Sequence, residues 1–426
     1  MAKTFAPVTA LLLSVALLIM GNGLQGTLLP VRASLEAFDA LSIGVMGSAY
    51  YLGFVVGCVR GVALIRRVGH IRVFTALAAI ASTVALVHAI WVTPWSWWLL
   101  RALTGFCFAG LYVVIESWLN DKADNSNRGT IMGVYTMINL SVIVAGQMML
   151  VFDSPLRFTL FALASILVSI AAVPVALTSA PQPAPLAKAK LQPARLYRLS
   201  PSAVIGVLIA GVSSGAFWSL GPVYAGRYSG DPTDIAIFMS AGALGGALAL
   251  YPLGRLSDRV DRRQVMIGAC ILSVAAAACL IFFGGKGPWQ LIGFGLLFGV
   301  GSMPVYSIAA ALAFDHAGKG EVVEVASGLL LMNGIGSVVG PLVASAAMKG
   351  MGPPGLFATT AAAHFLLASF ALWRSVVRAR APEEIRNEFD LTSTAPTMAA
   401  LDPDAVEEGQ NTEDRNQLSE GKISAT

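Results

Sequence analysis

The sequence carries little charge for its length. Only 12% of the 426 residues are Asp, Glu, Lys or Arg, whereas soluble domains carry about 25%. Hydrophobic residues make up 56% of the chain, and the mean hydropathy is +0.72. This composition excludes a soluble protein and predicts a chain that crosses a membrane many times.

Motifs of several catalytic and cofactor-binding classes are also missing. The four cysteines lie in apolar runs without CxxC spacing, so neither disulfides nor a metal site is expected. No Gly-Lys-Ser/Thr phosphate loop occurs, which argues against direct use of ATP. Nothing resembles a catalytic triad or a metal-ligand cluster, so we predict no enzyme activity, no cofactor and no metal.

About twelve apolar segments follow one another, each near the roughly 20 residues that span a bilayer. The expected spans are 8–30, 42–64, 72–92, 96–119, 129–152, 156–178, 202–224, 235–256, 264–284, 288–313, 323–348 and 354–377. Four prolines and four basic residues at 179–200 predict a solvated cytoplasmic linker. The chain thus divides into a first half (1–178), this linker, a second half (201–378) and a tail (379–426) too polar to fold alone.

Basic residues predict how the chain lies in the membrane. With both termini inside, seventeen Lys and Arg residues fall on the inner side and five on the outer side, which predicts an inner-membrane protein with cytoplasmic termini. Because these cations are spread over short loops, they indicate contact with anionic membrane lipid and no nucleic-acid partner. Trp95, Trp97 and Trp98 are then expected at the outer interface, where their rings would anchor a helix end. We expect a monomer.

An internal repeat relates the two halves. Several residues recur at an offset of 194, namely Gly21 and Gly215, Tyr112 and Tyr306, Asp121 and Asp315, Asn139 and Asn333, and Gly146 and Gly340. Two six-helix halves repeated in parallel orientation place a binding site between them, near the middle of the bilayer.

The loop after the eighth span carries the most specific motif. It reads GRLSDRVDRR from Gly254 to Arg263 and resembles the loop signature of the major facilitator superfamily, G-x-L-a-D-r-x-G-r-[RK]. A first-half copy begins at Gly61 but has Ile65 in place of the acid. The resemblance implies the major facilitator fold, an all-α membrane protein with twelve transmembrane helices in two parallel six-helix repeats. It also implies a conformational latch, for which the candidate residues are Gly61, Gly254, Asp258, Arg259 and Arg262.

Two charged residues of the fourth span are candidates for proton coupling. Arg101 and Glu116 lie about 22 Å apart along one helix and on nearly one face, and charges inside a membrane usually face a cavity or a partner. Arg101-x-x-x-Gly105 resembles a superfamily motif whose arginine is associated with proton transfer in proton-coupled members. The segment that begins at Glu116 resembles the YcaD-type subgroup. Glu116 either exchanges a proton with a cavity or pairs with a loop cation such as Arg128, and both alternatives stay open.

Neutral polar residues within the spans are candidates to line a substrate cavity. They are Asn22, Gln25, Asn139, Gln147, Ser214, Trp218 and Asn333. Amides, hydroxyls and an indole suit a small, largely uncharged organic solute, which they would hold by hydrogen bonding and stacking.

The pattern as a whole predicts a secondary active transporter that works by alternating access, with proton coupling left open. Gly336-x-x-x-Gly340-Pro341 resembles a motif of antiporters, although it lies in the eleventh rather than the fifth span. This resemblance slightly favours efflux as the direction of transport. Uptake of a planar nutrient, such as a riboflavin-like vitamin or a nucleobase, is the alternative. A non-transporting membrane receptor is a third hypothesis.

Overall fold

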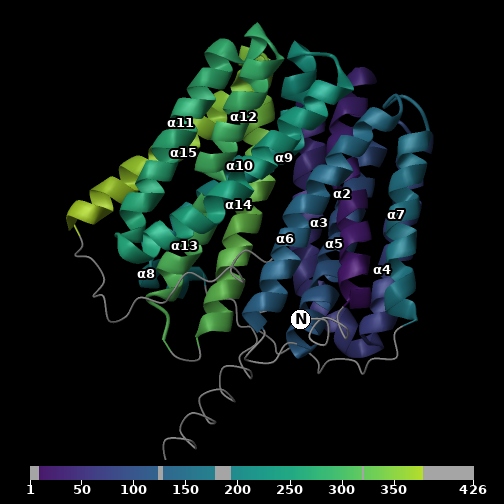
Figure 1. The fold of residues 1–426 in the computed structure, drawn as a ribbon, viewed down its shortest axis with the longest axis horizontal. Coiled ribbons are helices and arrows are strands. Elements are labelled where there is room, and N and C mark those ends of the chain that lie inside the picture. The colour runs from purple at the N-terminus through teal and green to yellow at the C-terminus, as the bar shows by residue number, and fades with distance from the viewer. Residues whose placement is uncertain (1–8, 123–127, 178–192, 319–320, 378–426) are drawn as a thin grey trace, which may run out of the picture.

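A computed structural model describes residues 9–122, 128–177, 193–318 and 321–377 of the chain. These residues form one bundle of helices (Figure 1). Twelve segments are long and apolar enough to cross a membrane, which confirms the expected all-α fold. The predicted tail and most of the predicted linker lie outside the described residues, and the division into four parts stays a prediction.

The helices follow the predicted order. The first six spans are α2 (Thr9–Leu35), α3 (Ala40–Val68), α4 (His70–Ile90), α5 (Pro94–Lys122), α6 (Arg128–Met148, continued by η1, Met149–Phe152) and α7 (Thr159–Ala176). After the short helix α8 (Pro193–Leu199), the second half contains α9 (Pro201–Tyr228), α10 (Pro232–Arg259), α11 (Arg262–Phe283, followed by η2, Gly284–Lys286), α12 (Pro288–Ser302), α13 (Pro304–Phe314), α14 (Val322–Met351) and α15 (Gly355–Val377).

The tenth span is interrupted. The span expected over 288–313 is present as Pro288–Phe314, and it consists of α12 and α13 with a break at Met303. Pro304 follows the break. Because proline lacks an amide hydrogen and its ring clashes with the preceding turn, it interrupts a helix at this point.

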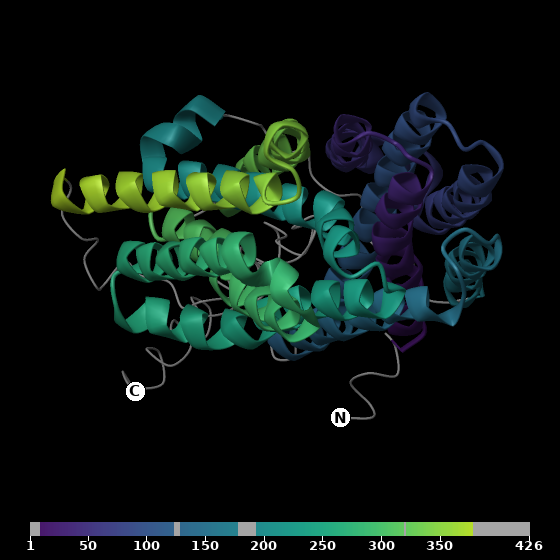
Figure 2. The same ribbon diagram turned by 90° about the horizontal axis from the view of Figure 1, so that it is seen from above.

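Both halves use the same helix pairing. In the first half α2 packs against α6 and α7, and α3 packs against α5; in the second half α9 packs against α14 and α15, and α10 packs against α12. The repeated glycines lie in these contacts. A Cβ added to Gly146 would lie 2.3 Å from the carbonyl oxygen of Met20, and one added to Gly340 would lie 2.1 Å from that of Val212. The sequence repeat is thus a repeat of close helix contacts, with the two halves side by side in Figure 2.

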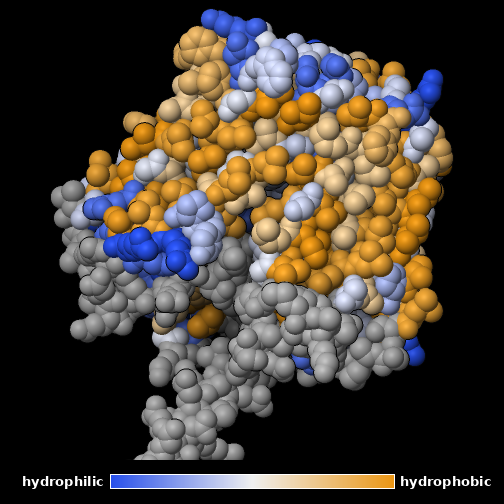
Figure 3. Space-filling view, viewed as in Figure 1, coloured by the Kyte–Doolittle hydropathy of each residue, from blue (hydrophilic) through white to orange (hydrophobic). Residues whose placement is uncertain are grey.

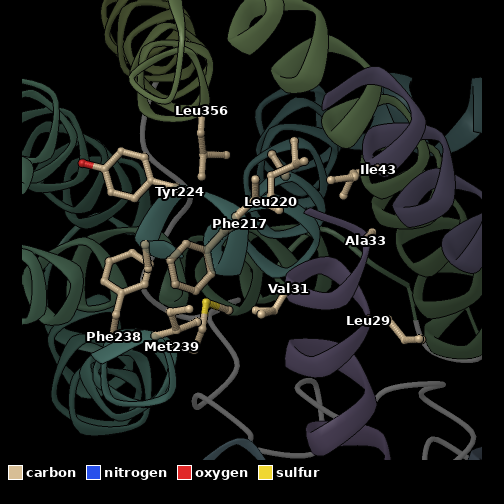
Figure 4. Packing of buried hydrophobic residues seen from close by; sticks show 14 of the residues in the cluster. Leu29, Val31, Ala33, Ile43, Phe217, Leu220, Tyr224, Phe238, Met239 and Leu356 are labelled. Atoms are coloured by element: carbon tan, nitrogen blue, oxygen red, sulfur yellow. The ribbon is translucent and has the colours of Figure 1, made fainter. Parts of the chain in front are cut away.

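Within the described residues the hydrophobic core has three parts, and one of these joins the halves. We call the end of the bundle where α2 begins and α8 lies the linker end, and the opposite end the far end. At the far end one cluster contains residues of both halves, among them Val31, Ile43, Phe217, Leu220 and Tyr224 (Figure 4). Toward the linker end the first half and the second half each have a separate cluster.

Candidate functional site

The two halves meet closely at the far end. Helix α3 packs against α14 and α9, and α6 packs against α10. The hydroxyl of Ser48 donates a hydrogen bond to the carbonyl of Val338 at 2.6 Å, and the hydroxyl of Ser240 donates one to the side-chain oxygen of Gln147 at 3.3 Å. Gln147, which was predicted to line the cavity, therefore contributes to the contact that closes the far end.

Glycines make this contact possible. A Cβ on Gly44 would lie 2.1 Å from the hydroxyl oxygen of Ser345 and 2.7 Å from the carbonyl oxygen of Pro341. A Cβ on Gly47 would lie 2.3 Å from the hydroxyl oxygen of Ser219. Helix α3 of the first half thus crosses α14 and α9 of the second half at a distance that side chains at these two positions would prevent.

The linker end differs from the far end. Among the described residues, no buried apolar cluster at the linker end contains side chains from both halves. Figure 3 shows the apolar belt of the molecule between hydrophilic patches at its two ends. The halves are therefore held together at the far end and have separate cores toward the linker end.

Arg101 lies inside the first half, next to aromatic and amide side chains. Its side chain is buried, and the guanidinium carbon lies 4.2 Å from the centre of the Tyr50 ring on α3. Its Nε and Nη1 atoms have no hydrogen-bond partner within the described parts of the chain. Asn22 on α2 interacts with the hydroxyls of Tyr50 and Tyr112, so three helices contribute to this group.

Gln25 is the second predicted site residue with unpaired atoms. Its residue surface is 1% exposed, and neither side-chain amide atom has a partner in the described residues. Gln25 follows Asn22 by three positions on α2, and residues at this spacing are neighbours on a helix surface. Asn22, Tyr50, Tyr112 and Arg101 form one polar group in the first half, which we call the Arg101 group. Gln25 lies one helical turn from its Asn22.

Glu116 has different neighbours from Arg101, although both lie on α5. The Glu116 side chain is buried, and its Oε1 accepts a hydrogen bond from the hydroxyl of Tyr135 at 3.2 Å. Tyr306 of the second half is near enough to interact electrostatically with Glu116. The alternative in which Glu116 pairs with Arg128 concerns a side chain outside the described residues.

The remaining predicted cavity residues are partly engaged within their own helices. The Asn139 amide donates to the carbonyl of Tyr135 at 2.8 Å, and the Ser214 hydroxyl donates to the carbonyl of Gly211 at 3.3 Å. Trp218 is half-buried and packs against the shared far-end cluster, and Asn333 is also half-buried. The structure therefore gathers the predicted residues into several places rather than one.

The predicted latch residues form a compact ionic group in the second half. Arg262 is 2% exposed and donates to Asp315 at 2.8 Å, to Asp258 at 3.0 Å and to the hydroxyl of Ser257 at 2.9 Å. These contacts join α10, α11 and the end of α13, all in the same half. Arg259, by contrast, is exposed. A latch between the halves stays a prediction for this loop.

The first-half loop has another arrangement at the same place. Gly61 lies against Gly110, since its Cβ would be 3.4 Å from the Cα of that residue. Ile65, which replaces the acid, is buried in the first-half cluster. His70 begins α4 as Arg262 begins α11, and its Nε2 lies 3.2 Å from the Ser117 hydroxyl. The first half thus has a histidine that interacts electrostatically with Asp121, together with the buried Ile65, where the second half has an arginine and two acids.

Two tyrosines at the charged residues were not predicted from the sequence, and one tryptophan lies elsewhere than expected. Tyr50 and Tyr135 contact the two charged residues, but an aromatic residue in an apolar run carries no signal that distinguishes it from core. The interface role expected for Trp97 is wrong, because its ring is fully buried and its Nε1 donates to the carbonyls of His88 and Trp91. Trp95, in contrast, is exposed. Within the described residues no group of His, Cys, Asp and Glu could hold a metal ion.

The chain is similar to known membrane transporters. Residues 11–229 and 203–403 match the sequence model of the Major Facilitator Superfamily. The chain is 25% identical over 370 residues to an uncharacterized MFS-type transporter of Enterobacter sp. (strain 638), covering 84% of this chain and 94% of that protein. It is 24% identical over 368 residues to the uncharacterized MFS-type transporter YcaD of Escherichia fergusonii, with the same coverage.

Two solved structures share the fold. A mutant form of the nucleoside transporter NupG is similar with a TM-score of 0.75 and 14% sequence identity, covering 86% of this chain and 99% of that one. A bacterial homolog of the human lysosomal transporter Spinster, in an inward-facing and occupied conformation, has a TM-score of 0.71 and 15% identity, covering 89% and 98% of the two chains.

Proposed function

Because this chain belongs to the Major Facilitator Superfamily and is a multi-pass membrane transporter rather than an enzyme, we propose that it moves a small, largely uncharged organic solute by alternating access. The membrane is the inner membrane, with the linker end in the cytoplasm. This orientation follows the excess of Lys and Arg on the predicted inner side.

The observation that supports alternating access is the asymmetry between the two ends of the bundle. Both halves contribute to one apolar cluster at the far end, whereas their cores are separate toward the linker end. Two rigid halves that rock about a central site would alternate between this arrangement and its opposite. In the proposed orientation the structure corresponds to the state that is open to the cytoplasm.

The solute would bind between the halves, next to the Arg101 group. Asn22 and Tyr50 are partly exposed, and Trp218 and Asn333 of the second half are also partly exposed. Amides and aromatic rings recognise an uncharged body by hydrogen bonds and stacking. Proton coupling would use Glu116, because a buried carboxyl can change its charge whereas an arginine stays protonated.

Efflux is the direction that we favour, and uptake of a planar nutrient is the second candidate. A ring-bearing vitamin or a nucleobase would suit the aromatic and amide side chains. The likeness in fold to NupG, which is a nucleoside transporter, adds support to this alternative.

Reconstituted vesicles test the proposal. The purified protein would first be screened by thermal shift against drugs, vitamins, nucleobases and sugars, and each stabilising compound would be loaded into vesicles with and without a pH gradient. We expect flux of at least one compound, with loss of the response to pH in Glu116→Gln. Normal transport with an unchanged response to pH in both Glu116→Gln and Arg101→Ala would refute the proton-coupling role, and absence of any flux would contradict the transporter proposal.

A further inference from the structure

The guanidinium of Arg101 is a buried cation without an acidic partner in the described part of the chain. Its residue surface is 9% exposed, and no ion pair that involves it occurs among the described residues. Glu116, on the same helix, is about 22 Å away along the axis. Buried charges are ordinarily paired, because removing an ion from water costs several kcal/mol. Arg101 therefore lacks the partner that its position calls for.

Two donor atoms of Arg101 are unpaired. The guanidinium carbon lies 4.2 Å over the centre of the Tyr50 ring, a cation–π contact that occupies none of the N–H donors. Nε and Nη1 have no partner among the described residues. Each of these two N–H donors can form a charge-assisted hydrogen bond with an oxyanion oxygen.

Gln25 provides an independent second observation. It is 1% exposed, and both amide atoms are unpaired in the described chain, which is unfavourable for a buried polar group. Gln25 lies on α2 one turn from Asn22, and Asn22 interacts with the same Tyr50 that covers Arg101. Asn22 of α2 and Arg101 of α5 therefore border the same tyrosine, and the unpaired Gln25 amide lies one helical turn from Asn22.

We infer that Arg101 and Gln25 bind a carboxylate, or another planar oxyanion, on the transported solute. The inference rests on the proposed transport function and narrows its substrate to a solute with one negative charge and an otherwise uncharged body. Asn22 and Tyr50, which border Arg101, are partly exposed, and the solute would approach the buried donors from their side. Because an arginine keeps its proton, Arg101 supplies a permanent positive charge, whereas proton movement is left to Glu116.

The test compares ligand pairs that differ in charge and little else. Thermal stability of the full-length protein in detergent would be measured with nicotinate and nicotinamide, benzoate and benzamide, and indole-3-acetate and indole-3-acetamide. At least one acid should raise the unfolding midpoint, whereas its amide should not. Arg101→Gln should weaken binding of that acid roughly tenfold to a hundredfold, as expected when a hydrogen-bonded charge partner is lost.

Three further variants separate binding from folding. Arg101→Lys keeps the charge but loses the planar array of donors, and should bind the acid more weakly than wild type and more tightly than Arg101→Gln. Gln25→Met removes the amide at nearly constant volume and should weaken acid binding without affecting the amides. Arg60→Gln, at an exposed position on α3, should leave acid binding unchanged.

The inference is overturned if the amides stabilise the protein as well as the acids do, if Arg101→Gln binds the acid like wild type, or if no acid stabilises the protein. If wild type and Arg101→Gln transport a solute without negative charge equally well, this result would contradict the proposed anion site but not the transporter proposal. Vesicles that move no solute at all would contradict the transporter proposal itself.

Discussion

The guanidinium Nε of Arg262 lies 2.8 Å from Oδ2 of Asp315, and both side chains are 2% exposed. The pair joins the first residue of α11 to the residue that follows α13. Asp258 on α10 accepts a second bond from the same guanidinium at 3.0 Å, but its side chain is 28% exposed. One arginine therefore has a buried and a partly solvated acidic partner, and the two should differ in their contribution to stability.

Replacing the buried partner should destabilise the protein much more than replacing the partly exposed one. Asp315→Asn removes the buried acidic partner of the Arg262 guanidinium. Breaking a buried ion pair in this way typically lowers the free energy of unfolding by about 3–5 kcal/mol. Asp258→Asn removes a pair at i,i+4 spacing, and such pairs contribute about 0.3–0.5 kcal/mol at exposed sites. Thermal unfolding of both variants in the same detergent measures the difference. Equal unfolding midpoints would show that burial does not set the strength of this ionic group.

Gly44 should control closure of the far end. Gly44→Ala would place a methyl group 2.7 Å from the carbonyl oxygen of Pro341, in the contact between α3 and α14. We expect the two halves to separate there, so that the state open at the far end gains population. Spin labels at Leu156 and Lys286, in a background without the four native cysteines, would report a longer distance between the halves.

Gly26 is the matched control for this substitution. A Cβ at Gly26 on α2 would meet no atom within 4 Å. Gly26→Ala should therefore leave the distance between the labels unchanged, with the gain of about 0.5–1 kcal/mol that alanine brings to a helix. A distance in Gly44→Ala equal to that in Gly26→Ala would contradict the role of Gly44 in closure.

The sequence predicted the spans and the repeat but not the grouping of the polar residues. Hydrophobic length determines a span locally, and the pair Gly146 and Gly340, at an offset of 194, reflects a contact that each half makes in the same way. Whether Gln147 lines a cavity or bonds to Ser240 depends on how the halves pack, and that packing leaves no local pattern. The sequence also did not predict that Arg101 has no ion-pair partner among the described residues, because Glu116 lies on the same helix and on nearly the same face.

Gly105 should affect stability within the first half rather than the distance between the halves. A Cβ at Gly105 would lie 1.9 Å from the carbonyl oxygen of Tyr50, which is backbone and cannot turn aside. Gly105→Ala must push α5 away from α3, and we expect a loss of about 1–3 kcal/mol, as is usual for overpacking. Thermal unfolding measures it, with Gly268→Ala on α11 as the control at a position without neighbours within 4 Å. A normal midpoint in Gly105→Ala would show that α3 and α5 can separate at little cost.

Asp39 should stabilise the start of α3 in a manner that depends on pH. Its Oδ1 accepts a hydrogen bond from the backbone amide of Ser42 at 3.0 Å, and the hydrogen bonds from Ser42 hold the pKa of the Asp39 carboxyl below its ordinary value. A lowered pKa in the folded state means that the carboxylate stabilises the helix above the ordinary value of about 4, and that this contribution is lost as the pH falls through the folded-state pKa. Asp39→Ala should cost about 1 kcal/mol at neutral pH, as loss of a helix N-cap does.

Asp39→Asn separates the cap from the charge. An asparagine oxygen can accept the same hydrogen bond but does not titrate, so the first turn of α3 should stay protected in this variant as the pH is lowered. Hydrogen exchange at the amides that follow Asp39, corrected for the intrinsic effect of pH on exchange, measures the opening of this turn. Wild type should lose protection in acid, Asp39→Asn should keep it, and Asp39→Ala should lack it throughout. If wild type and Asp39→Asn lost protection together, the charge of Asp39 would have no part in holding the helix end.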